Sequence, residues 1–107
     1  MDNRIKELWT DALKSKKYKQ CSGKLKQANT YCCLGVLTEL YLKEHPNDSE
    51  TKRYLNMEGM VLNKQVKEWA GLEESGAIDH PQYSSLADMN DDGRSFEDIA
   101  DNIGRLL

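Results

Sequence analysis

The residues best suited to chemistry are lysines in the N-terminal part of the chain. From Ala12 to Thr38 the sequence contains no acidic residue and six lysines: Lys14, Lys16, Lys17, Lys19, Lys24 and Lys26. Ammonium groups without nearby counter-charges can attract phosphate groups or an acidic protein surface. A second interpretation stays open, because residues 73–107 carry nine acidic and two basic side chains that these lysines could simply offset.

A second candidate is the run Asp88-Met-Asn90-Asp-Asp92-Gly93, which matches the opening of a calcium-binding loop. Such a loop needs a bidentate carboxylate at its twelfth position. That position is occupied by Ile99, which has no oxygen in its side chain. The run therefore predicts a turn between two helices without a bound metal.

The three cysteines, Cys21, Cys32 and Cys33, do not form a disulfide framework, because their number is odd and adjacent helical residues point about 100° apart. Neither cysteines nor histidines have the spacing of a zinc site. Cys32 and Cys33 lie in the densest apolar run of the chain, which predicts buried, reduced and inert thiols. No cofactor is expected.

The apolar run predicts the helix that must position these side chains. Residues 31–44 form this expected central helix, and Thr30 is its expected N-cap. Gly35 inside it costs a helix about 1 kcal/mol relative to alanine, which indicates that another backbone crosses closely there.

The remaining patterns predict an α+β fold that is mostly helical, with about four short helices around the central helix. These helices are expected at residues 2–14, 63–71, 85–91 and 95–107. A small β-hairpin or extended loop is expected near residues 18–30, a polar loop at 46–53, and a second hairpin near 54–62. The chain is predicted to be a single globular domain, residues 1–107.

The composition restricts the class of protein further. The chain has 107 residues and a net charge of −3, and no stretch has the apolar length of a signal peptide or a membrane span. A cytoplasmic protein without membrane contact is therefore expected.

Residues 86–104 are similar to the first half of a DNA-binding helix-turn-helix. No recognition helix follows and the segment is acidic, so sequence-specific DNA binding is not expected.

Five blocks occur in order along the chain: Trp9-x-x-Ala12-Leu13, Tyr18-x-Gln20-x-x-Gly23-x-Leu25, Tyr31-Cys-Cys-Leu-Gly-Val-Leu37, Val66-x-x-Trp69-Ala-Gly-Leu72 and Leu86-x-x-Met89-Asn-Asp-x-Gly93-x-Ser-Phe-x-x-Ile99-Ala-Asp-x-Ile103. Together they resemble a family of small uncharacterised proteins common in bacteriophage genomes and in some bacteria. The sequence departs from it at Asn63, where relatives often have proline, and at Thr38, where many have cysteine. The family has no assigned activity, so the resemblance implies a phage-type accessory protein that acts on a host component.

Two functions are expected from these features. The first is a non-catalytic accessory protein that modulates a host component, by binding a host protein or by sequestering a small anionic, nucleotide-like ligand. The alternative is a small enzyme acting on a nucleotide or phosphate ester, for which no catalytic residue is assigned. The candidate ligand-binding residues are Lys16, Lys17, Tyr18, Lys19, Gln20, Lys24, Lys26, Asn90, Asp91 and Ser95.

The structure can distinguish these expectations. A pocket that joins Tyr18, Gln20 and Asn90 would favour a ligand, whereas an exposed apolar patch would favour a protein partner. Oligomerisation is left open.

Overall fold

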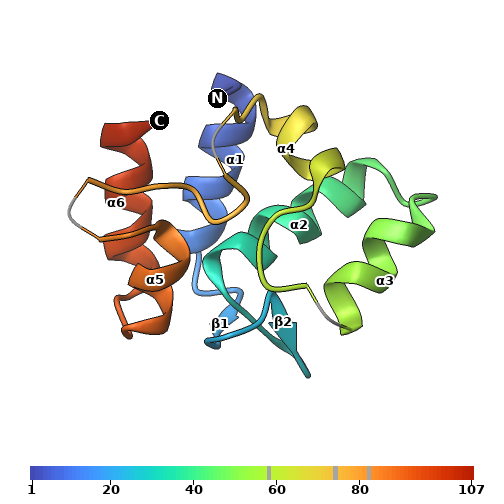
Figure 1. The fold of residues 1–107 in the computed structure, drawn as a ribbon, viewed down its shortest axis with the longest axis horizontal. Coiled ribbons are helices and arrows are strands. Elements are labelled where there is room, and N and C mark those ends of the chain that lie inside the picture. Colours follow the sequence, from blue (N-terminus) through green and yellow to red (C-terminus); the bar gives the residue numbers. More distant parts are fainter. Residues whose placement is uncertain (58, 74, 82) are drawn as a thin grey trace.

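The computed structural model describes residues 1–57, 59–73, 75–81 and 83–107, and within them the chain forms six helices and a small three-stranded sheet (Figure 1). The helices are α1 (Asn3–Lys14), α2 (Cys33–Glu44), α3 (Ser49–Met57), α4 (Lys64–Ala70), α5 (Leu86–Asp91) and α6 (Phe96–Leu106). The strands are β1 (Lys19–Gln20), β2 (Lys26–Gln27) and β3 (Thr30–Tyr31). The predicted α+β fold, mostly helical, is confirmed. None of the helices in the described ranges has the length and apolar character needed to cross a bilayer.

Helix α2 runs through the middle of the molecule, as its apolar sequence predicts (Figure 1). Its buried residues are Cys33, Leu34, Gly35, Val36, Leu37, Thr38 and Tyr41. The predicted N-cap is wrong: Cys32 is the cap, and its Sγ accepts a hydrogen bond from the Gly35 amide at 3.4 Å. Thr30 lies in β3 instead, because its hydroxyl donates across the hairpin turn to the Gln27 carbonyl at 2.6 Å.

The close backbone crossing predicted at Gly35 is present. A Cβ atom on Gly35 would lie 1.8 Å from the carbonyl oxygen of Leu25 and 3.2 Å from its Cα. The same carbonyl accepts a hydrogen bond from the Cys32 amide at 3.0 Å, so the chain before β2 is fixed against the first turn of α2. Glycine is needed here for space.

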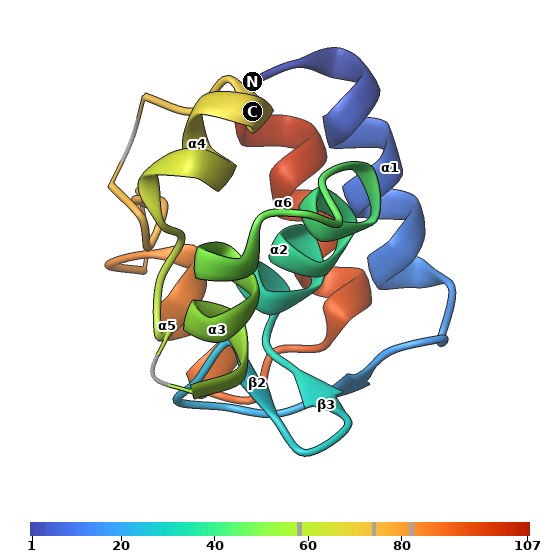
Figure 2. The same ribbon diagram turned by 90° about the vertical axis from the view of Figure 1, so that its right-hand side faces the viewer.

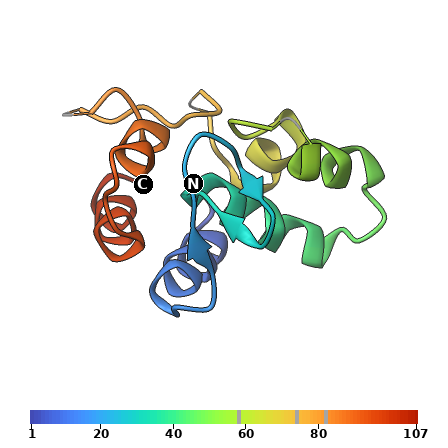
Figure 3. The same ribbon diagram turned by 90° about the horizontal axis from the view of Figure 1, so that it is seen from below.

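The predicted hairpin near residues 18–30 is also present. Strands β2 and β3 pair antiparallel, with Lys26 opposite Tyr31, and the turn between them holds Ala28 at a φ of 54°. Strand β1 pairs parallel on the other side of β3, which gives the order β1-β3-β2. Figures 2 and 3 show this sheet at one end of the molecule, next to the start of α2 and between α1 and α3.

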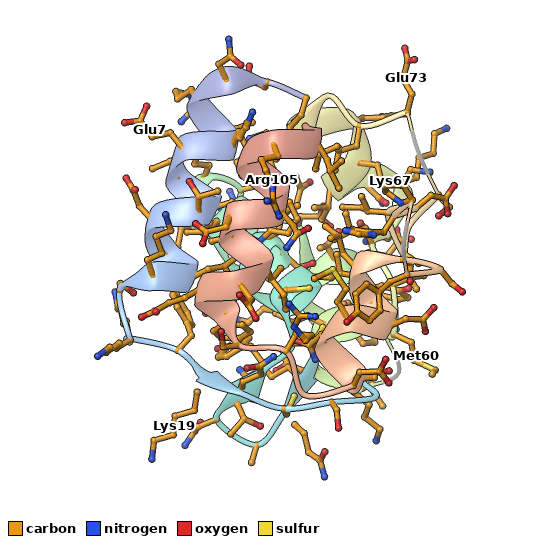
Figure 4. The ribbon with its side chains drawn as sticks, turned by 90° about the vertical axis from the view of Figure 1, so that its left-hand side faces the viewer. Glu7, Lys19, Met60, Lys67, Glu73 and Arg105 are labelled. Carbon is orange, nitrogen blue, oxygen red and sulfur yellow. The ribbon has the colours of Figure 1, made fainter. Side chains whose placement is uncertain are left out.

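Helices α1 and α6 lie side by side, and α1 also packs on α2 (Figures 1 and 4). The residues that they bury are Ile5, Trp9 and Leu13 of α1 and Phe96, Ile99, Ala100 and Ile103 of α6. The indole N–H of Trp9, which is 0% exposed, donates to the Cys33 carbonyl at 2.9 Å. Asp2 and Ser95 cap the two helices, because their side chains accept hydrogen bonds from the Ile5 and Asp98 amides.

The second tryptophan, Trp69 in α4, joins three helices at the C-terminal end of α2. Its indole N–H donates to Glu44 Oε1 at 3.3 Å, and Arg4 of α1 donates two hydrogen bonds to the same carboxylate at 2.8 and 3.0 Å. The Arg4 guanidinium lowers the pKa of Glu44. The Trp69 ring also lies edge-on to Tyr41 and His45, with centroid distances of 5.5 and 6.1 Å.

Helix α3 covers most of the polar loop expected at 46–53 and the first half of the hairpin expected near 54–62, so both predictions are wrong there. Residue 58, in the expected turn of that hairpin, lies outside the described residues. Asp48 caps the helix, since its Oδ1 accepts a hydrogen bond from the Thr51 amide at 3.0 Å and its Oδ2 accepts one from the Thr51 hydroxyl at 2.8 Å. Only Thr51 and Leu55 of this helix are buried. Two buried positions make too weak a periodic pattern for α3 to be recognised.

We expect Gly35→Ala to destabilise the protein, although alanine favours a helix by about 1 kcal/mol. The added methyl group would overlap the Leu25 carbonyl, which is fixed by its hydrogen bond to Cys32. Overpacking of this kind costs about 1–3 kcal/mol, and more where the backbone must move. Denaturant unfolding measures the decrease in the free energy of unfolding.

Gly104→Ala is the matched control, because Gly104 also lies within a helix and its Cβ would meet nothing within 4 Å. This change should raise the free energy of unfolding by about 0.5–1 kcal/mol. Equal stability of the Gly35→Ala and Gly104→Ala variants would contradict the close crossing at Leu25.

Candidate functional site

The lysines of the predicted binding stretch are spread over the surface. Lys26 lines a groove between β2, α2 and α3, Lys16 lines a second hollow, and Lys24 lines a third. Lys19 is exposed on β1 and points outwards (Figure 4). The stretch therefore does not form one continuous binding surface.

The groove at Lys26 gathers lysines from three separate elements. It has a volume of about 230 Å³, and its cationic residues are Lys26 of β2, Lys43 of α2 and Lys52 of α3. The rest of its lining is Glu39, Leu42, Pro46, Leu55 and Asn56. These eight residues define the lysine groove.

Two tyrosines position the lysines near the groove. The Tyr18 hydroxyl accepts a hydrogen bond from Lys43 Nζ at 3.2 Å, and this contact raises the pKa of Lys43. Lys26 Nζ lies 5.3 Å from the ring centre of Tyr31, and the two tyrosine rings meet edge to face at 5.3 Å. Lys17 Nζ lies 6.0 Å from the Tyr18 ring, so the aromatic pair attracts three ammonium groups.

Asp48 fixes α3 against α2, and with it the separation of Lys43 and Lys52. The Tyr41 hydroxyl of α2 donates a hydrogen bond to Asp48 Oδ2. This bond raises the pKa of Tyr41 to about 12 and lowers the pKa of Asp48. Because Asp48 also caps α3 through Thr51, one carboxylate orients both helices that line the lysine groove.

Ion pairs among the described residues do not neutralise the charge of the lysine groove. In the part of the chain that the structure describes, no carboxylate lies within 4.0 Å of the ammonium groups of Lys26, Lys43 or Lys52. In the same part, Lys14 is the one lysine of the acid-free stretch that pairs with the C-terminal third, at 3.3 Å from Asp101. Both partners of that pair are exposed, so it contributes little stability.

Asn90 connects three segments that are far apart in the sequence. Its Oδ1 accepts a hydrogen bond from the Cys33 amide at 3.1 Å, and its Nδ2 donates to the Cys21 carbonyl at 2.7 Å. The Cys21 amide donates to the Tyr31 carbonyl at 2.9 Å, which continues the parallel pairing of β1 and β3. The Asn90 side chain, 1% exposed, therefore takes the place of the next backbone hydrogen bond in the ladder.

Gln20 and Asp91 complete this arrangement, which we term the Asn90 clamp. Gln20 Nε2 donates to Asn90 Oδ1 at 2.9 Å and to the Arg94 carbonyl at 2.7 Å. Asp91 Oδ1 accepts a hydrogen bond from the Gly23 amide at 2.9 Å. The three predicted ligand-binding residues are thus brought together, but their polar atoms bind one another and the backbone.

A hollow of about 260 Å³ joins several other candidate residues. Lys16, Tyr18, Gln20 and Ser95 line it, beside α6. Asn90 is buried and does not line this hollow, so the expected combination of Tyr18, Gln20 and Asn90 is incomplete there. The Ser95 hydroxyl is used as the N-cap of α6.

Three residues of the lysine groove are absent from the predicted site: Lys43, Lys52 and Asn56. Lys43 lies outside the acid-free stretch, at the end of an apolar helix. Lys52 and Asn56 lie one turn apart on α3, and that spacing becomes meaningful only once the segment is known to be helical.

The thiols of Cys32 and Cys33 are buried, as predicted. Burial raises the pKa of Cys32 to about 11 and raises that of Cys33 well above its usual value. Both thiols are therefore protonated at neutral pH, and a protonated thiol is a poor nucleophile. Cys21 is half-buried.

The acidic run at Asp88 lies in α5 and the turn that follows it. Asp88 and Asp92 are exposed, whereas the Asn90 side chain is buried in the clamp. The predicted interhelical turn is present, with Gly93 at a φ of 86°. Among the described residues, no group of three or more His, Cys, Asp or Glu side chains is placed to hold a metal ion.

Comparison with known proteins gives a family and no activity. A family model described as Domain of unknown function (DUF8296) matches residues 1–107, which include both the lysine groove and the Asn90 clamp. No curated protein and no solved structure matches the chain.

We expect Asn90→Asp to destabilise the protein at pH 7 by about 2–4 kcal/mol, because a carboxylate cannot donate to the Cys21 carbonyl. Burial raises the pKa of this new carboxyl group above that of the unfolded chain. Between the pKa of the unfolded variant and the higher pKa of the folded variant, the folded protein binds a proton that the unfolded chain releases. The stability of the variant therefore falls as pH rises through this range. Urea unfolding at neutral and mildly acidic pH measures both effects.

Asn29→Asp, at an exposed position of the hairpin turn, is the control and should change stability by less than about 0.5 kcal/mol. A loss of stability in Asn90→Asp that is the same at both pH values would contradict the buried position of the amide in the Asn90 clamp.

We also expect a thiol reagent without denaturant to label Cys21 long before Cys32 and Cys33, because Cys21 is half-buried whereas the other two cysteines are buried. Burial also raises the pKa of Cys32 to about 11, so its thiol should react slowly at neutral pH. Mass spectrometry of the labelled peptides gives the order. Rapid labelling of all three thiols would be inconsistent with a buried start of α2.

Proposed function

The chain belongs to the family described as Domain of unknown function (DUF8296), and we propose that it is a non-catalytic binding protein that holds a small anionic, nucleotide-like ligand in the lysine groove. One observation carries the proposal: lysines from three elements line one groove, and Glu39 is the one acidic residue among the described residues of its lining. Lysine binds phosphate oxygens as a point charge, and several lysines together bind more than one oxygen.

The lining of the lysine groove supports a ligand with both a charged and an apolar part. Its volume of about 230 Å³ lies below the range of about 300–1,000 Å³ that is typical of drug-sized ligands. Leu42 and Leu55 add apolar surface beside the lysines. A mononucleotide or a similar phosphorylated ring compound fits this combination better than a bare inorganic anion.

The contacts around the groove also support binding, because they orient the cations before a ligand arrives. Tyr18 accepts a hydrogen bond from Lys43, and Tyr31 lies beneath Lys26. Side chains that are already ordered lose less entropy on binding, which raises affinity.

The other interpretations have less support. Charge balance alone would call for contacts between the lysine stretch and the acidic C-terminal third. Among the described residues, Lys14–Asp101 is the one such ion pair, and it is exposed. An enzyme would need an activated group, and the raised pKa values of Cys32 and Cys33 disfavour those thiols as nucleophiles. The phage-like sequence blocks support an accessory role in a host cytoplasm, in which the ligand is withheld from a host process.

We expect AMP and pyrophosphate to bind with an affinity that falls as salt is added, because exposed charges are screened over about 8 Å at physiological ionic strength. The triple change Lys26→Gln, Lys43→Gln and Lys52→Gln should weaken AMP binding at least about tenfold, since each lost charged hydrogen bond is worth about 1.5–3 kcal/mol. Single changes at Lys43 and Lys52, which are exposed, should alter stability by no more than about 0.5 kcal/mol. Isothermal titration calorimetry measures binding, and thermal unfolding measures stability.

The matched control is the triple change Lys16→Gln, Lys19→Gln and Lys24→Gln, which removes the same charge outside the lysine groove. It should change AMP binding by less than about twofold, because these lysines lie beyond direct contact. Equal weakening by both triple variants, or no anion binding by the wild type, would show the proposal to be wrong. Release of phosphate from the nucleotide during incubation would support the enzyme instead.

A further inference from the structure

A second groove, lined largely by apolar side chains, lies apart from the lysine groove. It has a volume of about 280 Å³, and Met60 beside it is 61% exposed. Its lining is Gly23, Lys24, Cys32, Met60, Val61, Ala77, Ser85, Ala87, Asp88 and Asp91, and these residues define the methionine groove. Figure 4 shows Met60 at the edge of the molecule, beside α5. The two grooves share no lining residue.

The wall that carries Met60 and Val61 is held by backbone hydrogen bonds at both of its ends. The Gly59 carbonyl accepts a hydrogen bond from the Leu25 amide at 2.8 Å, and the Leu62 amide donates to the Gly76 carbonyl at 2.9 Å. The exposure of two adjacent hydrophobic side chains is therefore a fixed property of this surface.

The opposite wall is also preformed. The Ala87 amide donates to the Ala77 carbonyl at 3.3 Å, and the Leu86 amide donates to the Ile78 carbonyl at 2.8 Å. Because Ala77 and Ala87 have small side chains, this wall leaves room for an apolar group from outside. A preformed apolar hollow with a flexible methionine at its edge is typical of surfaces that accept a partner's side chain.

The charges around the methionine groove favour a basic partner. Asp88 and Asp91 line it on the α5 side, and Asp92, next along the chain, is exposed. Lys24 is the one basic residue of the lining. Carboxylates at the rim of an apolar interface steer and orient a cationic segment.

We propose that the methionine groove docks a segment of a partner protein in which an apolar side chain stands next to arginine or lysine. The apolar side chain enters between Met60 and Ala87, and the cation meets Asp88. This site is independent of the lysine groove, so the proposal goes beyond anion binding.

The test uses two short fluorescent peptides, Gly-Ser-Arg-Leu-Leu-Arg-Ser-Gly and the same peptide with glutamate in place of arginine. The arginine peptide should bind saturably in fluorescence anisotropy, and the glutamate peptide at least about tenfold more weakly. Met60→Ser should weaken binding of the arginine peptide at least about fivefold, since the change removes apolar contact area. Asp88→Lys should reduce the ratio of the affinity for the arginine peptide to the affinity for the glutamate peptide.

Each variant has a matched control. Met57 is 62% exposed but lies outside the methionine groove, so Met57→Ser should change binding by less than about twofold. Glu7→Lys repeats the charge change of Asp88→Lys on the exposed side of α1 (Figure 4). The proposal is overturned by an absence of saturable binding, by a preference for the glutamate peptide, or by equal effects of each variant and its control. Circular dichroism establishes that every variant is folded.

Discussion

The backbones at Cys21 and Cys33 meet across the side-chain amide of Asn90, and much of the fold depends on this contact. A primary amide offers a carbonyl and an N–H, as a peptide group does, and Asn90 uses both. The sheet can therefore end and α2 can begin at the same place without two unpaired backbone groups, each of which would cost about 1–3 kcal/mol if buried. Aspartate lacks the donor, and serine is too short to span the gap.

The same contact connects the C-terminal third to the lysine groove. Asn90 fixes the end of β1, and Tyr18 directly precedes that strand. The Tyr18 hydroxyl in turn holds Lys43, while its ring packs against Tyr31. The arrangement of cations on one face is therefore set in part by an amide in the core, and the acidic C-terminal segment contributes to the groove through geometry rather than through charge.

Local signals explain which parts of the fold could be predicted from the sequence. The caps at Asp2 and Ser95, the hairpin turn, and the close approach at Gly35 each depend on a few neighbouring residues. Helix α3 could not be recognised, because it buries only two side chains. The lysine groove depends on that helix, so Lys52 stayed outside the predicted site. The role of Asn90 depends on partners that lie 57 and 69 residues away in the sequence.

The contrasting surroundings of the two tryptophans make them separate optical reporters. Trp9 is fully buried and donates its N–H to a backbone carbonyl, so its fluorescence should lie at shorter wavelength and change only when the core opens. Trp69 is partly exposed beside Glu44 and His45, where α1, α2 and α4 meet. Loosening of that junction should therefore alter the red side of the emission spectrum first, and unfolding of the whole protein should alter both sides.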